Sequence, residues 1–338
     1  MLGNQTPFMS QKSKLTGQKH LRQALERLHH KHGSCHEGQV ATYIPELAKS
    51  NPDHFGVAVA EVDGEVHEVG ETSAEFTIQS ISKAFLFGLA VETHGRDAVL
   101  KRIGVEPSGE AFNSLELRSS RKPFNPMINA GAITDTGMVT GKNPKEKIGK
   151  ILALLSGAAG RELRIDQAVY RSEKETGHRN RAIGYLLKNV DLIDGEVEEV
   201  LDVYFQQCSV LVNARDLAIM GATLANLGTN PVTGKEVLSF DSVRDVLSVM
   251  FTCGMYDFAG EWAFRVGIPA KSGVAGGILA VINRQLGIGS YSPRLDSMGN
   301  SVRGIRVCTD LAEEMGLHVF NFTNVGSSFI KATFDTKK

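Results

Sequence analysis

The sequence has 338 residues, of which 42% are hydrophobic and 22% charged, and these values are typical of a folded globular protein rather than a disordered one. Its 37 basic and 38 acidic side chains nearly cancel, which argues against nucleic acid or an acidic membrane surface as a partner. No apolar run is long enough to predict a membrane-spanning helix, and we recognise no export signal. The four cysteines are far apart, so a disulfide framework is excluded and we expect a cytoplasmic protein with reduced thiols.

The first part of the chain is expected to hold an extension followed by helices. Residues 1–24 are polar and basic and predict a loose extension, with a single domain over residues 25–335. Apolar residues at helical spacing predict a helix over residues 18–30, and a second, short helix is expected over residues 41–49. The histidine-rich segment 29–36 lacks the second pair of ligands that zinc sites need, so no metal site is predicted.

Strand patterns occur near both ends of the chain. Residues 55–62 are β-branched and apolar, and Asp63-Gly64 separates them from an alternating segment, which predicts a hairpin. Strand character returns over residues 268–271, 277–283 and 286–291. Helical patterns occupy residues 80–94, 144–155, 176–188, 197–208, 214–227, 242–251 and 298–315.

This order of elements predicts an α/β (α+β) fold with one antiparallel sheet built from the N- and C-terminal segments and flanked by helices. The α/β lobe is expected over about residues 25–78 and 256–335. An inserted all-helical lobe is expected over about residues 79–255.

The strongest chemical signal is Ser80-Ile81-Ser82-Lys83 at the start of an apolar helix. Residues i and i+3 share a helix face, so Lys83 is expected beside Ser80. A serine hydroxyl is a weak nucleophile until a base takes its proton, and lysine can be that base only when neutral. Burial and nearby positive charge both favour the neutral form. A capping serine with a surface lysine would give the same pattern, but the apolar sequence that follows favours a buried helix.

A second element, Lys271-Ser272-Gly273-Val274, follows a predicted strand. In serine acyl transferases of the penicillin-recognising type, a Lys-Ser/Thr-Gly strand borders the serine and contributes a cation and backbone N–H groups to the oxyanion site. A second lysine would also lower the pKa of Lys83 by repulsion. The glycines here do not match the spacing of nucleotide-binding loops, so no cofactor is predicted.

Five further polar side chains lie in apolar or turn-rich segments: Asn129, Glu173, Asn180, Tyr204 and Tyr256. Glu173 and Asn180 are seven residues apart, so two helical turns, or a cap and its helix, could direct them toward one site. Taken singly, each is explained better by a structural role, and only the set as a whole indicates chemistry.

Taken together, these segments resemble the serine-dependent glutaminase family, in its bacterial type. The resemblance covers about residues 38–311. Its motifs lie at residues 43–48, 79–83, 106–109, 125–132, 172–180, 204–206, 222–226, 253–258, 269–277 and 298–302. It implies a β-lactamase/transpeptidase-like fold and an enzyme that converts L-glutamine and water to L-glutamate and ammonia.

The resemblance also implies roles for individual residues. Ser80 would be the nucleophile and Lys83 the base, and either Lys83 or Tyr256 would protonate the leaving ammonia. Ser80 and Val274 would donate backbone N–H groups to the oxyanion. The substrate site would be lined by Tyr43, Ser80, Asn129, Glu173, Asn180, Tyr204, Tyr256 and Val274, supported by Lys271, Ser272 and Gly273.

Two other functions remain open from the sequence. One is a β-lactamase or transpeptidase-like serine acyl transferase, although no clear Ser-Asp-Asn element lies between the two lysine motifs. The other is a non-catalytic amino-acid-binding or filament-forming scaffold, although a binder would not need both Ser80 and Lys83. The resemblance further implies a homodimer or homotetramer whose small-molecule partners are L-glutamine and L-glutamate.

Overall fold

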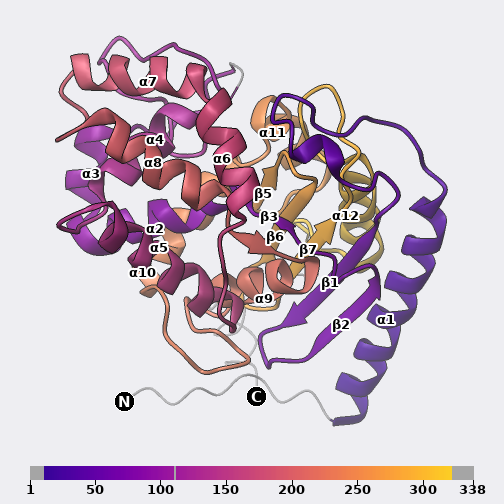
Figure 1. Ribbon diagram of the computed structural model, residues 1–338. Helices are drawn as coiled ribbons and strands as arrows, with labels where there is room; N and C mark the ends of the chain where they lie inside the picture. Colours follow the sequence, from indigo (N-terminus) through magenta and orange to yellow (C-terminus); the bar gives the residue numbers. More distant parts are fainter. Residues whose placement is uncertain (1–10, 110–111, 322–338) are drawn as a thin grey trace, which may run out of the picture.

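The chain folds into two lobes, one helical and one built around a β-sheet (Figure 1). The computed structural model describes residues 11–109 and 112–321. Residues 1–10 of the expected extension and residues 322–335 of the expected domain lie outside the described residues. Within the described ranges, no helix combines the length and apolar character needed to cross a membrane.

Helices make up about half of the described residues. The α-helices are α1 (Gln11–Gly33), α2 (Ser82–His94), α3 (Arg96–Arg102), α4 (Asn129–Met138), α5 (Pro144–Ala159), α6 (Gln167–Thr176), α7 (His178–Asn189), α8 (Val197–Cys208), α9 (Ala214–Ala225), α10 (Phe240–Cys253), α11 (Ala259–Arg265) and α12 (Val302–Met315). Three 3₁₀ turns span Leu47–Lys49, Gln79–Ile81 and Tyr256–Phe258. The strands are β1 (Gly56–Glu61), β2 (Val66–Gly70), β3 (Phe76–Thr77), β4 (Leu211–Val212), β5 (Ala270–Gly273), β6 (Gly277–Ile282) and β7 (Leu286–Tyr291).

The larger sheet has five strands in the order β2-β1-β7-β6-β5, and all neighbouring strands are antiparallel. Strand β1 pairs with β7, so the N- and C-terminal parts of the chain meet at the centre of the sheet. The turn between β1 and β2 contains Gly64 at φ +94°, a left-handed conformation that glycine adopts without steric strain. The expected mixed fold, with an antiparallel sheet flanked by helices, is confirmed.

Alternate residues of β1 face opposite sides of the sheet. Val57 and Val59 belong to a buried cluster with α1, α11 and α12, whereas Ala58 and Ala60 pack with α9. The approach of α9 is close, because a Cβ at Gly289 on β7 would lie 2.1 Å from the backbone oxygen of Ala214. Helix α9 therefore covers the sheet, although the sequence predicts it within the helical lobe.

One predicted helix is absent from the structure, and another is preceded by a helix that was not predicted. The helix predicted over residues 41–49 is wrong, since only Leu47–Lys49 form a 3₁₀ turn. Pro45 lacks a backbone N–H and disfavours a helical conformation in the residue before it. The helix predicted over residues 176–188 is preceded by a separate helix, α6, and the two meet at Gly177. A Cβ at Gly177 would lie 2.5 Å from the ring of Phe205, so packing against α8 requires glycine at this break.

Helix α1 is longer than predicted and reaches into the expected extension. It begins at Gln11, and Leu21 and Ala24 are buried. The boundary expected after residue 24 therefore falls inside α1, and the described part of the extension is continuous with the domain.

Candidate active site

Ser80 lies on a tight turn at the entry to α2. It is the second residue of the 3₁₀ turn Gln79–Ile81, which runs directly into α2, and it is buried. Gln79 has φ +49°, a strained left-handed conformation for a residue other than glycine. Its Nε2 donates to Thr77 Oγ1 at 3.1 Å, which helps to hold the turn in this conformation.

Lys83 is fully buried one turn along the helix from Ser80. Its Nζ donates to Asn129 Oδ1 at 2.6 Å and lies 3.5 Å from the backbone oxygen of Met127. Burial lowers the pKa of Lys83 from 10.5 to about 8, although Cys208 and Glu173 oppose the shift. A neutral amine has two N–H donors and one lone pair, so two acceptors on Nζ leave the lone pair available to a hydroxyl.

Asn129 connects Lys83 to Asn180. It is the first residue of α4, and its Nδ2 donates to Asn180 Oδ1 at 2.8 Å. Asn180 lies in the first turn of α7. Three predicted site residues from three different helices therefore form one chain of hydrogen bonds.

Strand β5 passes beside the turn that carries Ser80. A Cβ at Gly273 would lie 3.0 Å from the backbone oxygen of Ile78 and 3.5 Å from Gln79 Cβ, so glycine permits this close approach. Val274 follows directly and is buried. The end of β5 is thus next to the serine, as the predicted oxyanion role of Val274 requires.

Lys271 is a second fully buried lysine, on β5. Its Nζ donates to the backbone oxygens of Gly254 at 3.0 Å and Ser272 at 2.8 Å. It also lies 4.3 Å from the ring centre of Tyr256. Burial and the positive charge of Lys83 lower the pKa of Lys271 well below its ordinary value. This lysine ties β5 to the segment that carries Tyr256.

Tyr256 is held between β5 and the serine. Its hydroxyl donates to the backbone oxygen of Ser272 at 3.1 Å, and its backbone has the strained value φ +56°. Burial raises the pKa of Tyr256, while a hydrogen bond with the Ser80 side chain acts in the opposite direction. Its ring centre lies 4.8 Å from that of Phe112. The phenol therefore remains protonated at neutral pH and contacts the proposed nucleophile.

Glu173 on α6 is buried and accepts a hydrogen bond from Gln79 Nε2 at 2.6 Å. Burial raises the pKa of Glu173 to about 7, although the Gln79 hydrogen bond and the positive charge of Lys83 oppose the shift. Tyr204 on α8 is also buried, and a hydrogen bond links its side chain to Cys208. The site thus contains a carboxyl group that changes charge near neutral pH.

A cavity of about 100 Å³ joins these groups. Six predicted residues line it: Tyr43, Ser80, Asn129, Glu173, Asn180 and Tyr204. Tyr43 is the most exposed of the six, at 55%. The other predicted residues lie outside this lining: Lys83, Tyr256, Lys271, Ser272, Gly273 and Val274. Lys83 and Tyr256 reach the lining through Asn129 and Ser80.

Six lining residues with polar or aromatic side chains were not predicted: Gln79, Phe112, Asn113, Thr176, Arg179 and Cys208. Gln79 directly precedes Ser80, and Arg179 directly precedes Asn180, so their positions next to predicted residues could have indicated them as site residues. Phe112 and Cys208 offered none, because only the tertiary fold brings them to the serine. The ring centre of Phe112 lies 5.9 Å from Lys83 Nζ.

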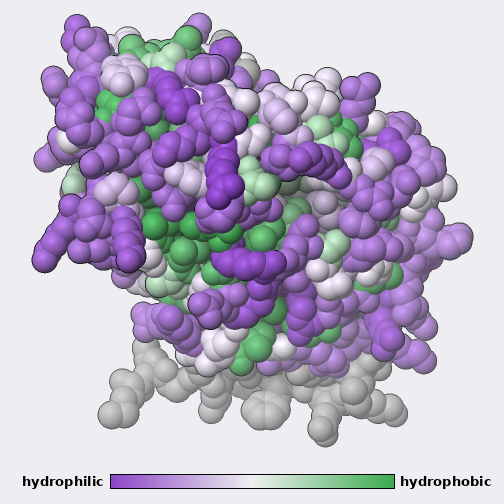
Figure 2. Space-filling view, viewed as in Figure 1, coloured by the Kyte–Doolittle hydropathy of each residue, from purple (hydrophilic) through white to green (hydrophobic). Residues whose placement is uncertain are grey.

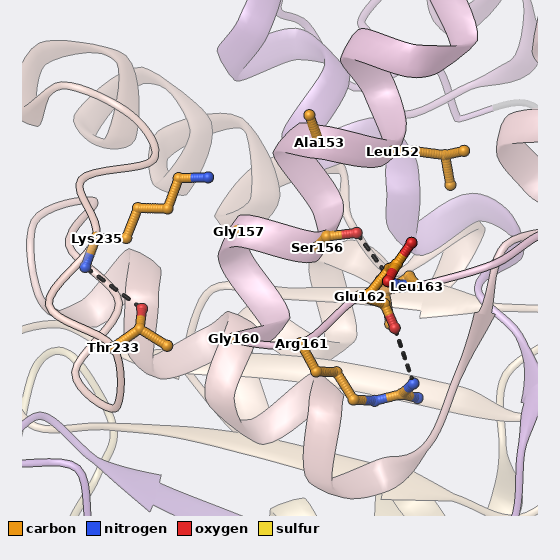
Figure 3. A pocket seen from close by; sticks show the side chains of 10 residues that line it. All are labelled: Leu152, Ala153, Ser156, Gly157, Gly160, Arg161, Glu162, Leu163, Thr233 and Lys235. Atoms are coloured by element: carbon orange, nitrogen blue, oxygen red, sulfur yellow. Dashed lines mark hydrogen bonds between the residues drawn. The ribbon is translucent and has the colours of Figure 1, made fainter.

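A larger cavity, of about 490 Å³, lies beside α5 on the helical lobe (Figure 3). Hydrophobic surface gathers in this region of the molecule (Figure 2). Two polar side chains of this cavity are already engaged: Ser156 Oγ accepts from the Leu163 N–H at 3.0 Å, and Arg161 Nη1 donates to the backbone oxygen of Glu162 at 3.2 Å. No predicted catalytic residue lines it, so the smaller cavity at Ser80 is the candidate active site.

Known proteins of similar sequence agree with the fold and family expected from the sequence. Residues 38–320 match the sequence model of the family described as Glutaminase. A glutaminase of Trichormus variabilis is 55% identical over 299 residues, which cover 88% of this chain and 90% of the relative. Glutaminase 2 of Clostridium perfringens is 47% identical over 287 residues, which cover 84% of this chain and 94% of the relative.

Solved structures of similar proteins extend the comparison to three dimensions. The probable glutaminase ybaS superposes with a TM-score of 0.87 at 41% identity, covering 89% of this chain and 98% of that one. Mglu in its glutamate form superposes with a TM-score of 0.86 at 43% identity, and the match covers 89% of this chain and 70% of that one. The β-lactamase-like fold expected from the sequence is thereby confirmed. The chain belongs to the glutaminase family.

Proposed function

We propose that this chain hydrolyses L-glutamine to L-glutamate and ammonia through a γ-glutamyl ester on Ser80. The observation that carries the proposal is the state of Lys83: an amine with no exposed surface, with a pKa lowered to about 8, one helical turn from a buried serine. At pH 7 the neutral form of such an amine costs about 1.4 kcal/mol, against about 4.8 kcal/mol for an unperturbed lysine.

Acylation begins with proton transfer from Ser80 Oγ to the Lys83 lone pair as Oγ attacks the side-chain amide carbon. The carbonyl oxygen becomes an oxyanion, for which the backbone N–H groups of Ser80 and Val274 are the proposed donors. Tyr256 gives its phenolic proton to the leaving nitrogen, and Lys83 returns a proton to the phenolate. Ammonia leaves, and the γ-glutamyl ester remains on Ser80.

Deacylation follows the same path with water as the nucleophile. Lys83 takes a proton from the water while its oxygen attacks the ester carbon, and Ser80 Oγ leaves after receiving a proton through Tyr256. The hydrogen bond between Tyr256 and Ser80 supports this route. L-glutamate departs, and the enzyme returns to its starting protonation.

The charge pattern of the cavity supports a free amino acid as substrate. Glu173 lies 2.6 Å from Gln79, beside the serine, and is the proposed partner of the α-ammonium group. The amide groups of Asn129 and Asn180, with the hydroxyls of Tyr43 and Tyr204, are the proposed neutral contacts. A substrate without the zwitterion would leave these buried polar groups unpaired.

Replacement of Ser80 by alanine tests the nucleophile. Wild type incubated briefly with L-glutamine and quenched in acid should carry the added mass of one γ-glutamyl group on the peptide containing Ser80, and S80A should carry none. Ammonia release by S80A should fall at least 1,000-fold, because the covalent route is lost. Turnover by S80A near the wild-type rate would overturn the proposal, and D-glutamine and L-asparagine serve as substrate controls.

We also propose a cytoplasmic location and a homodimer or homotetramer. The first is supported by the four cysteines, which are all free thiols, three of them buried. The second is supported by the family resemblance alone. Light scattering on the purified protein over a range of concentrations would test it, and a monomer at all concentrations would contradict it.

A further inference from the structure

Arg179 lines the candidate active-site cavity but has no role in the mechanism described so far. It lies in the first turn of α7, directly before Asn180, and its side chain is exposed. Its Nε donates to the backbone oxygen of Asn113 at 2.5 Å. Among the described residues, no carboxylate pairs with its guanidinium group.

Two neighbouring basic residues, Arg181 and Lys174, differ from Arg179 in this respect. Arg181 pairs with Glu198, and Lys174 pairs with Asp202. Their charges are balanced by acidic groups of the protein, whereas the charge on Arg179 is balanced by none in the described chain. An unbalanced guanidinium at the wall of a small cavity favours an anionic group on the ligand.

The cavity already holds a group of the opposite sign. Glu173 is buried beside Gln79, while Arg179 is exposed. Together they give the lining one anion and one cation, which is the charge pattern of a zwitterion. The amide of Asn180 cannot supply that cation, since it is neutral and its Oδ1 already accepts from Asn129.

We propose that Arg179 is a specificity-determining residue that attracts the α-carboxylate of the substrate. This inference rests on the proposed function. Its interaction is present equally in the bound substrate and the transition state, because the α-carboxylate takes no part in the reaction. It therefore acts on KM and leaves kcat nearly unchanged.

The test compares two substrates that differ only at this group, L-glutamine and its α-amide, in which the carboxylate is replaced by a neutral carboxamide. R179Q should raise KM for L-glutamine about tenfold, with kcat within twofold of wild type, and should change KM for the α-amide less than twofold. R179K, which keeps the charge but loses the Nε geometry, should recover most of the effect. R171Q, which removes an exposed arginine of α6 outside the cavity, is the matched control.

Equal loss on both substrates, or an R179K variant as defective as R179Q, would show that Arg179 only ties Asn113 to α7 and would overturn the inference. Calorimetric binding of L-glutamate and of its α-amide provides a second readout that requires no turnover. If wild type releases no ammonia from L-glutamine, the proposed function fails. The role of Arg179 is then still tested by binding: the preference for L-glutamate over its α-amide is compared between wild type and R179Q.

Discussion

A buried lysine acts as a base only in its neutral form, and at Lys83 the surroundings determine how much of that form exists. Burial lowers the pKa to about 8, while Glu173 limits the shift. About one tenth of the amine is therefore neutral at pH 7. The same carboxyl group has its own pKa raised to about 7. The two groups thus titrate within about one unit of each other, and we expect both to affect turnover.

The pKa values of Lys83 and Glu173 predict how kcat/KM for L-glutamine depends on pH. Lowering the pH below 8 protonates Lys83 and removes the base, so the rate falls about tenfold per unit. Below pH 7 protonation of Glu173 also removes the proposed partner of the ammonium group, and the fall should steepen. Steady-state ammonia release between pH 5.5 and 9 at constant ionic strength measures the profile, and a rate independent of pH between 6 and 8 would contradict it.

The same residues indicate how far sequence reasoning reaches. Ser80 and Lys83 could be paired from the sequence because three residues along a helix already bring two side chains together. The contact of Gln79 with Glu173 joins residues 94 positions apart, and no local pattern encodes it. The family resemblance identified Glu173 and Asn180 as site residues, whereas Phe112 and Cys208 could be placed in the site only from the tertiary fold.

At the scale of elements, the strands that form the centre of the sheet were predicted almost to the residue. β7 covers the predicted 286–291, because alternating small and apolar residues between turn signals leave few other structures. Helix α4 was missed, since its segment of small and polar residues, Asn129–Met138, has no clear apolar stripe. It forms because packing against α2, α7 and α8 stabilises it more than its own propensity does.

At the scale of elements, the proposed oxyanion site depends on the spacing between β5 and the turn of Ser80. A methyl group at Gly273 would meet the backbone oxygen of Ile78 at 3.0 Å, so the strand or the turn must move by a few tenths of an ångström. G273A should therefore lower kcat about tenfold, since small displacements at a reacting centre are costly. The melting temperature should fall by only a few degrees.

G260A is the matched control, because a methyl group at Gly260 on α11 meets no atom within 4 Å among the described residues. It should keep wild-type kcat and melt at the same or a slightly higher temperature. A G273A variant with wild-type kcat would mean that this spacing does not position the oxyanion donors.

At the scale of the whole molecule, the candidate site is formed by segments that are far apart in the sequence and meet only in the folded chain. The prediction that both ends of the chain build one sheet was correct, because the strand patterns lie at the ends and helical patterns lie between them. The position of α9 was not predictable in the same way. Its small residues face Gly287 and Gly289 of β7, and such a contact is visible only when both partners are placed.

The buried carboxyl group of Glu173 links its proposed role in substrate binding to the stability of the whole fold. Its pKa is about 7 in the folded chain and 4.5 in the reference state, so folding favours the protonated form. The stability that this group contributes is complete below pH 4.5 and is lost as the pH rises through 7. Above pH 7 the charged carboxylate destabilises the fold by up to about 3 kcal/mol relative to its neutral form.

Glu173→Gln removes this penalty while keeping the shape of the side chain. The free energy of unfolding at pH 8 should rise by 1 to about 3 kcal/mol over wild type, whereas at pH 5 the two proteins should be nearly equal. Urea denaturation at both pH values measures this difference. Activity should fall about 100-fold, because the ammonium group loses its anion, so the substitution exchanges function for stability. A variant that gains no more stability over wild type at pH 8 than at pH 5 would mean that folding does not raise the pKa of Glu173 and that its carboxylate is charged in the folded enzyme without cost to stability.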